Sequence, residues 1–469
     1  MNKETRERLS LITIVMFGVA VRLVLLVRAG DLDLYADEGS YAYLALLWNR
    51  FGFYSATENY LWPPFYPAFV ALFLRAFGES GLLAAKAAQV ALSGIIGAAV
   101  VLLARKAFSQ RAALIAGILW AAYLPLASFT HYLWPETLFL SVYLPGVLLY
   151  WRALERPDET GIGGFALVVA GSLLGLALLV KQSVAPLILI FTLVLTGLRI
   201  QGSLTRRLLR ASVFLLSAVV VVLPWALRNQ EVYGRVVFSG STLGQNLSMG
   251  INGRYRNIDY PDVVNYEELY NEGGRTYRWL IRSDAPEWQS SEAPNIIDRS
   301  SENVRRAWAF AADHPGFVLR SRIKRLADWA TPTSFFVRHF VLEMYRDQGV
   351  NVPGVRRLLI VASISTTVLV LIGAIPGLFW ALSDRTARIV ICSTLIAFMA
   401  TIPLVAMSRY RLPVEPLLIV LTAGFLAGEN RGAWRRPRAV ALVVTGWFLL
   451  GSLWLVNWVE IHAVLQKAL

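Results

Sequence analysis

Long apolar stretches separated by short polar linkers run along most of this chain. Eleven of them approach the roughly 20 residues that a helix needs to cross the hydrocarbon core of a bilayer. They cover residues 11–28, 82–104, 112–130, 134–151, 164–180, 184–199, 210–227, 356–381, 388–406, 412–428 and 439–459. A shorter apolar stretch at 63–77 begins with Pro63 and Pro64, which suit the first turn of a helix. The pattern predicts an all-α polytopic membrane protein.

The basic residues of the linkers set the expected orientation, because Lys and Arg favour cytoplasmic loops. The basic linkers are residues 1–10, 104–111, 151–160, 199–210, 383–388 and 429–438. If all of them lie inside, the stretch at 63–77 cannot cross, since a crossing there would put every later basic linker on the wrong side. We therefore expect eleven spans, with the N-terminus inside and the C-terminus outside. The stretch at 63–77 becomes an interfacial or re-entrant helix, with a short twelfth span as the alternative.

Two longer polar segments interrupt the apolar pattern, and this topology places both of them outside. The first covers residues 29–81, and the second covers residues 228–355. The second is rich in Asn, Gly, Tyr and acids. Its end, HPGFVLRSRIKRLADWATP, alternates basic and apolar residues at roughly helical spacing, which predicts an amphipathic helix on the outer membrane surface. The chain thus divides into a transmembrane part at 1–227, an extracytoplasmic loop at 228–355 and C-terminal transmembrane helices at 356–469.

Composition supports this class and excludes others. Of 469 residues, 56% are hydrophobic and 16% are charged, whereas a soluble domain has about 45–50% apolar and about 25% charged residues. The net charge of +14 would suit a nucleic-acid partner, but the basic residues lie between apolar stretches, as topogenic charges do. No nucleic-acid partner is therefore expected. The single cysteine, Cys392, cannot form an internal disulfide.

Two adjacent carboxylates lie just past the first apolar stretch, at a membrane boundary where carboxylates are costly to desolvate. Asp37 and Glu38 occur in LYADEGSYAYLALL, and the residues after them predict a helix that returns to the membrane. A solvated loop acid is the alternative reading, above all for Glu38. An acid at the lip of a membrane cavity is nevertheless a functional candidate by default. Such an acid can take a proton from an incoming hydroxyl.

Cations occur on the same outer side, where positive charge is disfavoured. Lys181 lies between two apolar stretches, and Arg228 ends another. Arg409 and Arg411 lie in SRYRLPVEP, which joins two stretches with almost no loop. Each cation alone could be an interfacial anchor, but several of them in tight outer turns predict an anion site. Cations stabilise a phosphate leaving group, so the combination predicts glycosyl transfer from a polyprenyl-phosphate sugar.

Five segments carry a resemblance to a known superfamily. In chain order they are ADEGSY, WPPFYPAFVALFLRAFG, LARKAFSQRAALIAGILWAAYLPLASFTHYLWPETLFL, PWALRNQEVYGRVVFSGSTLGQNLSMGIN and SRYRLPVEPLLIVL. In this order and topology the chain resembles the GT-C glycosyltransferases, in the branch that holds the protein O-mannosyltransferases and the lipid A aminoarabinose transferase. The resemblance implies the GT-C fold, with residues 1–227 as the catalytic module. It also implies inverting transfer from an undecaprenyl- or dolichyl-phosphate sugar to a hydroxyl of a lipid, glycan or protein acceptor.

The resemblance further implies roles for single residues, at the extracytoplasmic face of the cytoplasmic (inner) membrane. Asp37 matches the first-loop Asp proposed as catalytic base, and Glu38 stands beside it as a second catalytic candidate. The candidates for binding the donor phosphate are Lys181, Arg409, Arg411 and Arg228. The candidates for binding the acceptor or substrate are Glu136, Tyr41, Tyr66 and Tyr410. Some relatives carry a phosphate-binding Lys before the Pro-Pro pair, where this chain has Trp62, so the other cations would supply that charge.

The sequence leaves the sugar, the acceptor and the metal requirement open. No cofactor is predicted, because no His/Cys/Asp cluster has ligand spacing, although a divalent cation near Asp37 and Glu136 stays open. A transporter or flippase of lipid-linked sugars is the alternative function, since it would also show many spans and intramembrane charge. Transporters commonly show paired repeats with broken helices, and no such pairing is evident. In both cases membrane lipids surround the chain.

Overall fold

The computed structural model describes residues 3–29, 34, 37–52, 61–155, 162–197, 203–244, 246–247, 295–341, 352–401 and 408–468. Within these residues the chain forms helices and no strand. The central part of the expected loop at 228–355 lies outside the described residues, as does the end of the expected span at 388–406.

Each of the eleven apolar stretches contains a helix or most of one. The helices are α1 (Lys3–Ala29), α4 (Gly81–Ala107), α5 (Gln110–Ala122), α7 (Glu136–Glu155), α8 (Ile162–Val180), α9 (Ala185–Thr196), α10 (Leu204–Tyr233), α15 (Pro353–Pro376), α16 (Arg385–Met399), α17 (Glu415–Leu426) and α18 (Pro437–Val456). Within the described residues, seven helical segments are long and apolar enough to cross a membrane by length and composition. The chain is therefore a multi-pass membrane protein. Three further apolar helices are shorter, namely Gln110–Ala122, Gln182–Thr196 and Glu415–Leu426, so a count of eleven crossings stays a prediction.

The stretch at 112–130, expected as one span, is not one continuous helix, and whether it crosses the bilayer stays a prediction. Helix α5 ends at Ala122, where Tyr123 leaves the helical conformation with φ −82° and ψ 87°. A five-residue helix, α6 (Leu124–Ser128), follows with Pro125 in its first turn, a position that suits proline. The segment 129–135 then runs on without helix, and each residue from Phe129 to Trp134 is at most 5% exposed. A buried connecting segment of this kind is unusual, because loops normally follow the surface.

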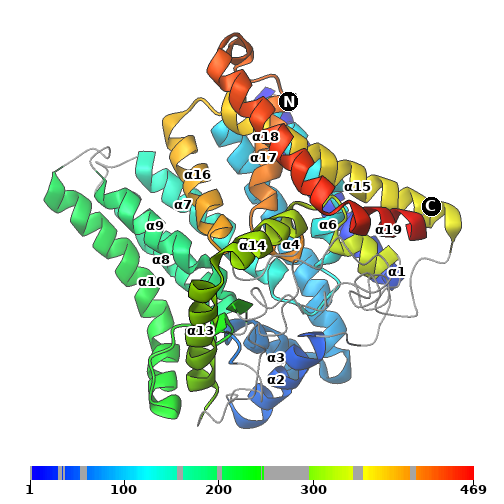
Figure 1. Cartoon of the computed structure of the whole chain (residues 1–469). Helices are drawn as coiled ribbons and strands as arrows, with labels where there is room; N and C mark the ends of the chain where they lie inside the picture. Colours follow the sequence, from blue (N-terminus) through cyan, green and yellow to red (C-terminus); the bar gives the residue numbers. More distant parts are fainter. Residues whose placement is uncertain are drawn as a thin grey trace.

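Two shorter helices, α2 (Asp37–Phe51) and α3 (Phe65–Phe77), pack against each other at the end of the bundle opposite the N-terminus (Figure 1). The turn η1 (Gly78–Ser80) separates α3 from α4, and Gly78 has a φ of +55° that L-residues rarely adopt. Helix α3 is thus a short helix of its own, as the Pro-Pro pair before it led us to expect. Its position relative to the bilayer stays a prediction.

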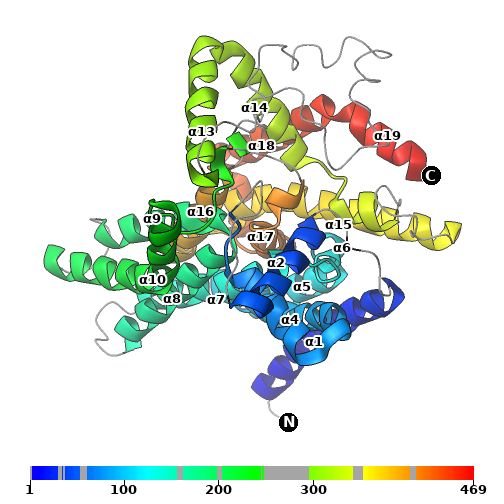
Figure 2. The ribbon, with the colours of Figure 1, turned by 90° about the horizontal axis from the view of Figure 1, so that it is seen from below.

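The described end of the large loop forms two helices, α13 (Ile296–Asp313) and α14 (Pro315–Ala330), joined at His314. Helix α14 is the amphipathic helix expected from the alternating residues. It packs against α18 and the turn η6 (Ser408–Arg411), and Figure 2 shows it close to α18 and the C-terminal helix α19 (Trp458–Ala468). The remaining short turns are η2 (Gln182–Val184), η4 (Phe336–Val341), η5 (Gly377–Ala381) and η7 (Arg431–Arg435).

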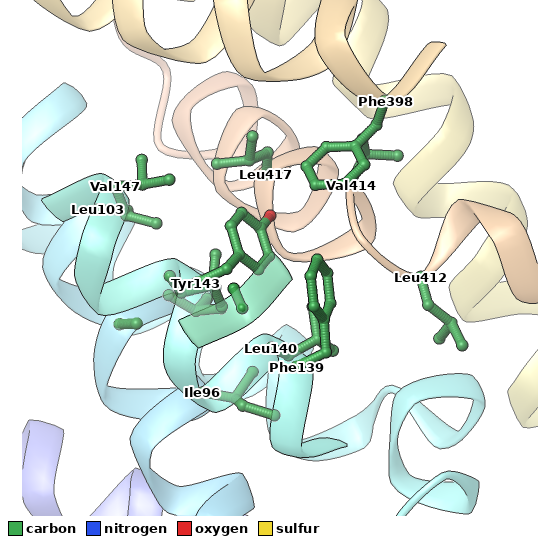
Figure 3. Close-up of a cluster of buried hydrophobic side chains, with 14 of the residues drawn as sticks. Ile96, Leu103, Phe139, Leu140, Tyr143, Val147, Phe398, Leu412, Val414 and Leu417 are labelled. Atoms are coloured by element: carbon green, nitrogen blue, oxygen red, sulfur yellow. The ribbon is translucent and has the colours of Figure 1, made fainter. Parts of the chain in front are cut away.

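A buried cluster fixes the start of α17 against α7 (Figure 3). The side chains drawn there come from α4, α7, α16 and the residues around the start of α17: Ile96, Leu103, Phe139, Leu140, Tyr143, Val147, Phe398, Leu412, Val414 and Leu417. Within this cluster the Tyr143 hydroxyl donates a hydrogen bond to the carbonyl oxygen of Pro413. The contact holds the turn before α17 in a defined position beside α7, whose first residue is Glu136.

Close helix packing at α1, α4 and α5 depends on two glycines. A Cβ added at Gly18 would lie 2.2 Å from the Trp120 ring, and one at Gly97 would lie 2.6 Å from it. The indole therefore fills space that a larger residue at either position would occupy. Small residues serve this purpose in membrane helices, because they let neighbouring backbones approach closely.

Candidate active site

Four charged side chains from distant parts of the chain form one continuous network. Arg409 donates from Nε to Oε1 of Glu136 at 2.6 Å and from Nη1 to Oδ2 of Asp37 at 2.8 Å. Lys181 donates from Nζ to the same Glu136 oxygen at 2.7 Å. The order is Asp37–Arg409–Glu136–Lys181, two carboxylates and two cations with no net formal charge. Sequence reasoning selected all four residues but did not pair them.

Each of the four residues lies at the end of a helix. Asp37 is the first residue of α2 and Glu136 is the first residue of α7, where the helix dipole favours negative charge. Lys181 lies between α8 and η2 in an extended conformation, with φ −153° and ψ 120°. Arg409 lies in η6, shortly before α17. The network is thus built at tight turns between helices, as the sequence indicated for both cations.

Solvent exposure differs along the network, from the buried Glu136 to the partly exposed Asp37. The side chain of Glu136 is 1% exposed, those of Lys181 and Arg409 are 15% and 16% exposed, and that of Asp37 is 34% exposed. Burial lowers the pKa of Lys181 from its ordinary value of 10.5, against the attraction of Glu136. Burial also opposes the charge of Arg409, but Glu136 and Asp37 outweigh it and raise the pKa of Arg409 well above its usual range. Arg409 therefore stays cationic.

Aromatic rings surround the two cations. The guanidinium carbon of Arg409 lies 4.0 Å from the ring centre of Trp134, a cation–π contact. Trp134 stacks on Tyr132 with ring centres 5.0 Å apart, and it meets Phe335 at 4.8 Å. Lys181 Nζ lies 5.6 Å from the ring centre of Tyr410. Tyr410 was among the residues predicted from the sequence, whereas Trp134 was not, although it lies only two residues before Glu136.

Glu38 is buried behind Asp37 and has a different environment. It is 0% exposed, and its Oε1 accepts the backbone N–H of Leu133 at 2.8 Å. The same oxygen lies 3.8 Å from Nζ of Lys86 in α4. Glu38 therefore ties α2 to the segment 129–135, next to Trp134. The solvated loop acid considered from the sequence does not describe Glu38, while a catalytic role for it stays a prediction.

The predicted tyrosines Tyr41 and Tyr66 are also buried, at 2% and 0% exposure. Their ring centres lie 4.8 Å apart, and the Tyr66 hydroxyl donates to Oε1 of Gln89 at 2.9 Å. Gln89 in turn donates from Nε2 to the carbonyl oxygen of Tyr132 at 2.8 Å. These contacts fix the segment 129–135 from the side of α3 and α4. A role of either tyrosine in binding an acceptor stays a prediction.

The sequence contains a signal for this support that our reasoning did not use. Lys86, Gln89 and Ser93 of α4 are at most 3% exposed in the described structure. Their spacing of three and four residues places them on one face of an otherwise apolar helix. Polar residues inside a membrane helix mark functional sites by default, so this stripe could have identified Lys86 and Gln89.

Arg411 is placed apart from the other predicted phosphate-binding cations. It is 0% exposed and donates from Nε to Oε1 of Glu415 at 2.9 Å. Its Nη1 donates to the carbonyl oxygens of Trp329 and Thr331, both at 2.8 Å. Arg411 therefore fastens the end of α14 to the start of α17, two residues beyond Arg409. We assign it to the support of the site and keep Arg409 as the candidate for phosphate.

Arg228, the fourth predicted phosphate-binding cation, lies near the end of α10. Its Nη1 donates to Oδ1 of Asn229 at 2.9 Å, and its guanidinium lies 5.0 Å from the ring centre of Trp225 and 5.4 Å from that of Tyr233. All three partners belong to α10 itself. These contacts stabilise the end of that helix, and they do not lead to Lys181 or Arg409.

A divalent cation near Asp37 and Glu136, which the sequence left open, stays an open question. The guanidinium of Arg409 bridges their carboxylates and supplies positive charge to both. Among the described residues, no group of three or more His, Cys, Asp or Glu side chains is placed to hold a metal ion.

Comparisons with known proteins agree with this architecture. Residues 62–226 match the family described as dolichyl-phosphate-mannose-protein mannosyltransferase. The whole chain is similar in structure to the oligosaccharyltransferase AglB of Archaeoglobus fulgidus, solved with an inhibitory peptide and a dolichol-phosphate. The TM-score is 0.53 at 15% identity, over 99% of this chain and 56% of AglB. The chain has the GT-C fold.

A second structure of the Archaeoglobus fulgidus oligosaccharyltransferase, tethered to an acceptor peptide, gives a TM-score of 0.53 at 16% identity over 99% of this chain and 55% of that one. ArnT from Cupriavidus metallidurans bound to undecaprenyl phosphate gives a TM-score of 0.38 at 14% identity, over 89% of this chain and 78% of that one. No curated protein matches the chain. This chain thus spans about half the length of the oligosaccharyltransferase, and the likeness shows the GT-C fold alone.

Proposed function

We propose that this chain is an inverting glycosyltransferase that moves a sugar from a polyprenyl-phosphate donor to a hydroxyl group at the outer face of the cytoplasmic membrane. The acceptor hydroxyl belongs to a lipid, a glycan or a protein. The observation that carries the proposal is the network of Asp37, Arg409, Glu136 and Lys181. It brings a carboxylate for proton transfer and two cations for a phosphate together at the helix ends of a membrane protein. The GT-C fold and the family match over residues 62–226 support it.

Lys181 and Arg409 are the pair that would hold the donor phosphate. Both contact the same oxygen of Glu136, so their nitrogens are close enough to share a phosphate group. An ammonium carries three N–H donors and a guanidinium five, and the contacts described above use only some of them. Both side chains are partly exposed. Positive charge here stabilises the polyprenyl phosphate as it leaves with the electron pair of the broken glycosidic bond.

Asp37 is the carboxylate that would act as base, because it is the exposed end of the network. As the acceptor oxygen attacks the anomeric carbon, Asp37 takes the proton of that hydroxyl. The bond between the anomeric carbon and the phosphate oxygen breaks on the opposite side of the sugar. The products are an inverted glycoside, a protonated Asp37 and a polyprenyl phosphate held by Lys181 and Arg409.

The ion pair between Arg409 and Asp37 implies an order of binding. Without a donor, the network is neutral and Arg409 holds Asp37 through a charge-assisted hydrogen bond. A donor phosphate brings additional negative charge and competes with Asp37 for Arg409. Donor binding therefore releases Asp37 for its role as base, and the acceptor reacts second. Sequence reasoning treated the base and the phosphate site as separate, whereas here Arg409 serves both.

The test uses the purified protein in lipid vesicles with undecaprenyl-phosphate and dolichyl-phosphate sugars that carry a radiolabel on the sugar. The expected result is transfer of label to an acceptor from an envelope extract, with release of polyprenyl phosphate and loss of both in Asp37→Asn. Movement of intact lipid-linked sugar across the vesicle membrane, without cleavage, would support the transporter alternative instead. Absence of binding and of cleavage for every donor would contradict the proposal.

A further inference from the structure

Three buried polar atoms around Arg409 have no hydrogen-bond partner in the described part of the chain. They are Oε2 of Glu136, Nε1 of Trp134 and Oγ of Ser408. The three residues are 1%, 2% and 4% exposed, respectively. The large majority of buried side-chain polar atoms in proteins are hydrogen-bonded, so each unpaired one needs an explanation. Three of them beside a candidate phosphate site indicate a place that a ligand completes.

Trp134 and Glu136 are held close to Arg409 by contacts already described, and Ser408 is its neighbour in the chain. The Trp134 ring lies 4.0 Å from the guanidinium carbon, and Oε1 of Glu136 lies 2.6 Å from Nε. Ser408 precedes Arg409 in the same short turn. Their hydrogen-bonding capacities are complementary, since an indole N–H only donates, a carboxylate oxygen only accepts and a hydroxyl does both. One hydroxyl group of a ligand could accept from Trp134 and donate to Glu136.

We propose that Trp134, Glu136 and Ser408 form the subsite for the donor sugar. The proposal rests on the glycosyl-transfer function proposed above, because a phosphate bound by Lys181 and Arg409 brings its sugar to this position. Only one oxygen separates that phosphate from the anomeric carbon, and Glu136 is already in contact with both cations. The free oxygen of Glu136 is therefore within reach of a hydroxyl on the sugar ring.

The charges around Glu136 select a class of sugar. Its carboxylate contacts two cations, at 2.7 Å and 2.6 Å, whereas Asp37, the second anion of the neutral network, contacts Arg409 alone. An amino sugar would bring a third positive charge to the same place, and like charges at close range repel. A hydroxyl group meets no such cost. The subsite therefore favours a neutral sugar, such as a hexose, over an amino sugar.

Trp134→Phe is the variant that isolates this subsite. It keeps an aromatic ring beside Arg409 and Tyr132 but removes the five-membered ring with its N–H, which has no partner among the described residues; the control variant must therefore lose the same ring. Trp151→Phe is the matched control, because Trp151 is 0% exposed, its Nε1 is also without a described partner, and it lies near the other end of α7. The probes are undecaprenyl phosphate alone and the same lipid carrying mannose, glucose or 4-amino-arabinose, titrated against the full chain in lipid nanodiscs.

We expect Trp134→Phe to weaken binding of the best neutral-sugar lipid roughly two- to tenfold, as loss of one hydrogen bond implies. Binding of undecaprenyl phosphate alone should not change, and Trp151→Phe should change neither. Wild type should bind the neutral-sugar lipids more tightly than the amino-arabinose lipid.

Unchanged binding of every sugar lipid in Trp134→Phe would overturn the subsite, while tight binding of undecaprenyl phosphate by the wild type would leave the proposed function in place. An equal loss for the sugar-bearing and sugarless lipids would overturn it too, because Trp134 would then act on the phosphate through Arg409. Preference for the amino-arabinose lipid would overturn the assignment of a neutral sugar. Failure of the wild type to bind any of the four lipids would overturn the subsite and the proposed function together.

Discussion

Arg409 donates a 2.6 Å hydrogen bond from Nε to Oε1 of Glu136, although 273 positions of sequence separate the two residues. The contact joins the start of α7 to the turn before α17. The proposed site therefore draws residues both from the expected module at 1–227 and from the expected C-terminal part at 356–469. Because Nη1 of the same guanidinium binds Asp37, any change at Arg409 alters the environment of both carboxylates at once.

Arg409→Gln should weaken binding of undecaprenyl phosphate about ten- to a hundredfold. A charge-assisted hydrogen bond is worth roughly 1.5–3 kcal/mol, which corresponds to that range of affinity. The fold should persist, because Glu136 keeps its contact with Lys181. The measurement is a titration of the lipid phosphate in nanodiscs, with the melting temperature recorded for the same sample.

Arg411→Gln is the matched control for that variant. It leaves Glu415, which is 1% exposed, without its cation, and breaking a buried pair in this way costs about 3–5 kcal/mol. We expect a lower melting temperature and near-normal phosphate affinity in the protein that remains folded. The opposite pattern in the two variants would assign the phosphate to Arg411.

The helices could largely be predicted from the sequence, because an apolar stretch of sufficient length between basic linkers has few alternatives in a membrane. The break in the helix within 112–130 could not be read from hydropathy alone, since Pro125 interrupts the helical pattern there without making the stretch polar. The ion pairs could not be predicted, because no periodicity relates Asp37 to a residue 372 positions away. The ion pair of Arg411 and Glu415 is an exception, because its two residues are close in the sequence. Arg411 ends η6 and Glu415 begins α17 four positions later, so this local pairing could have been considered from the sequence.

Asp37→Asn tests the base and the order of binding in one variant. General-base catalysis contributes typically 10²–10⁴-fold, so turnover should fall by about that factor. Affinity for undecaprenyl phosphate should rise, because Arg409 loses the anionic partner that competes with the phosphate. The two measurements are turnover at saturating donor and a lipid titration on the same preparation.

Glu38→Gln is the control for Asp37→Asn. An amide oxygen can still accept the N–H of Leu133, so we expect a smaller loss of turnover and no gain in phosphate affinity. If Asp37→Asn turned over like the wild type, Asp37 would be no base. If its phosphate affinity fell, Asp37 would help to form the phosphate site, and the exchange of partners at Arg409 would be wrong.

The charge of Lys181 should make donor affinity depend on pH. Burial lowers the pKa of this residue from 10.5, and only the protonated ammonium can donate three N–H bonds to a phosphate. Donor affinity should therefore fall as pH rises through the lowered pKa, before pH 10.5 is reached. Lys181→Arg should abolish this decline, since a guanidinium stays charged throughout. If donor affinity still fell with rising pH in Lys181→Arg, the titration of Lys181 would not be its cause.

The same lowered pKa of Lys181 should make the protein without donor more stable as pH rises, whereas donor affinity falls over the same range. A lysine whose pKa is lowered on folding binds fewer protons in the folded state than in the unfolded state. The free energy of unfolding therefore rises with pH between the lowered pKa and 10.5. The expected melting temperature increases slightly over a range in which donor affinity decreases, and thermal melts with and without undecaprenyl phosphate would show the two trends separately.

Lys324→Met should loosen the attachment of α14 to the C-terminal helix and through it the active site. Lys324 is 3% exposed and pairs with Asp328 of its own helix and, at 2.8 Å, with Glu460 of α19. Its removal leaves two buried carboxylates, with Arg325 at 3.4 Å from Asp328 as a remaining partner. The loss of one partner from a buried ion pair costs about 3–5 kcal/mol, so we expect a clearly lower melting temperature.

The effect should reach turnover, because the end of α14 also supplies the carbonyl oxygens of Trp329 and Thr331 that hold Arg411, two residues from Arg409. Lys106→Met is the control, since its ion pair with Glu155 is 27% and 39% exposed and such pairs contribute about 0–1 kcal/mol. Adding Glu460→Gln to Lys324→Met removes one of the two buried carboxylate charges and should restore part of the stability. If Lys324→Met melts and turns over like Lys106→Met, this buried cluster does not hold α14 in place, and the turn that carries Arg409 is positioned by Glu415 and Tyr143 instead.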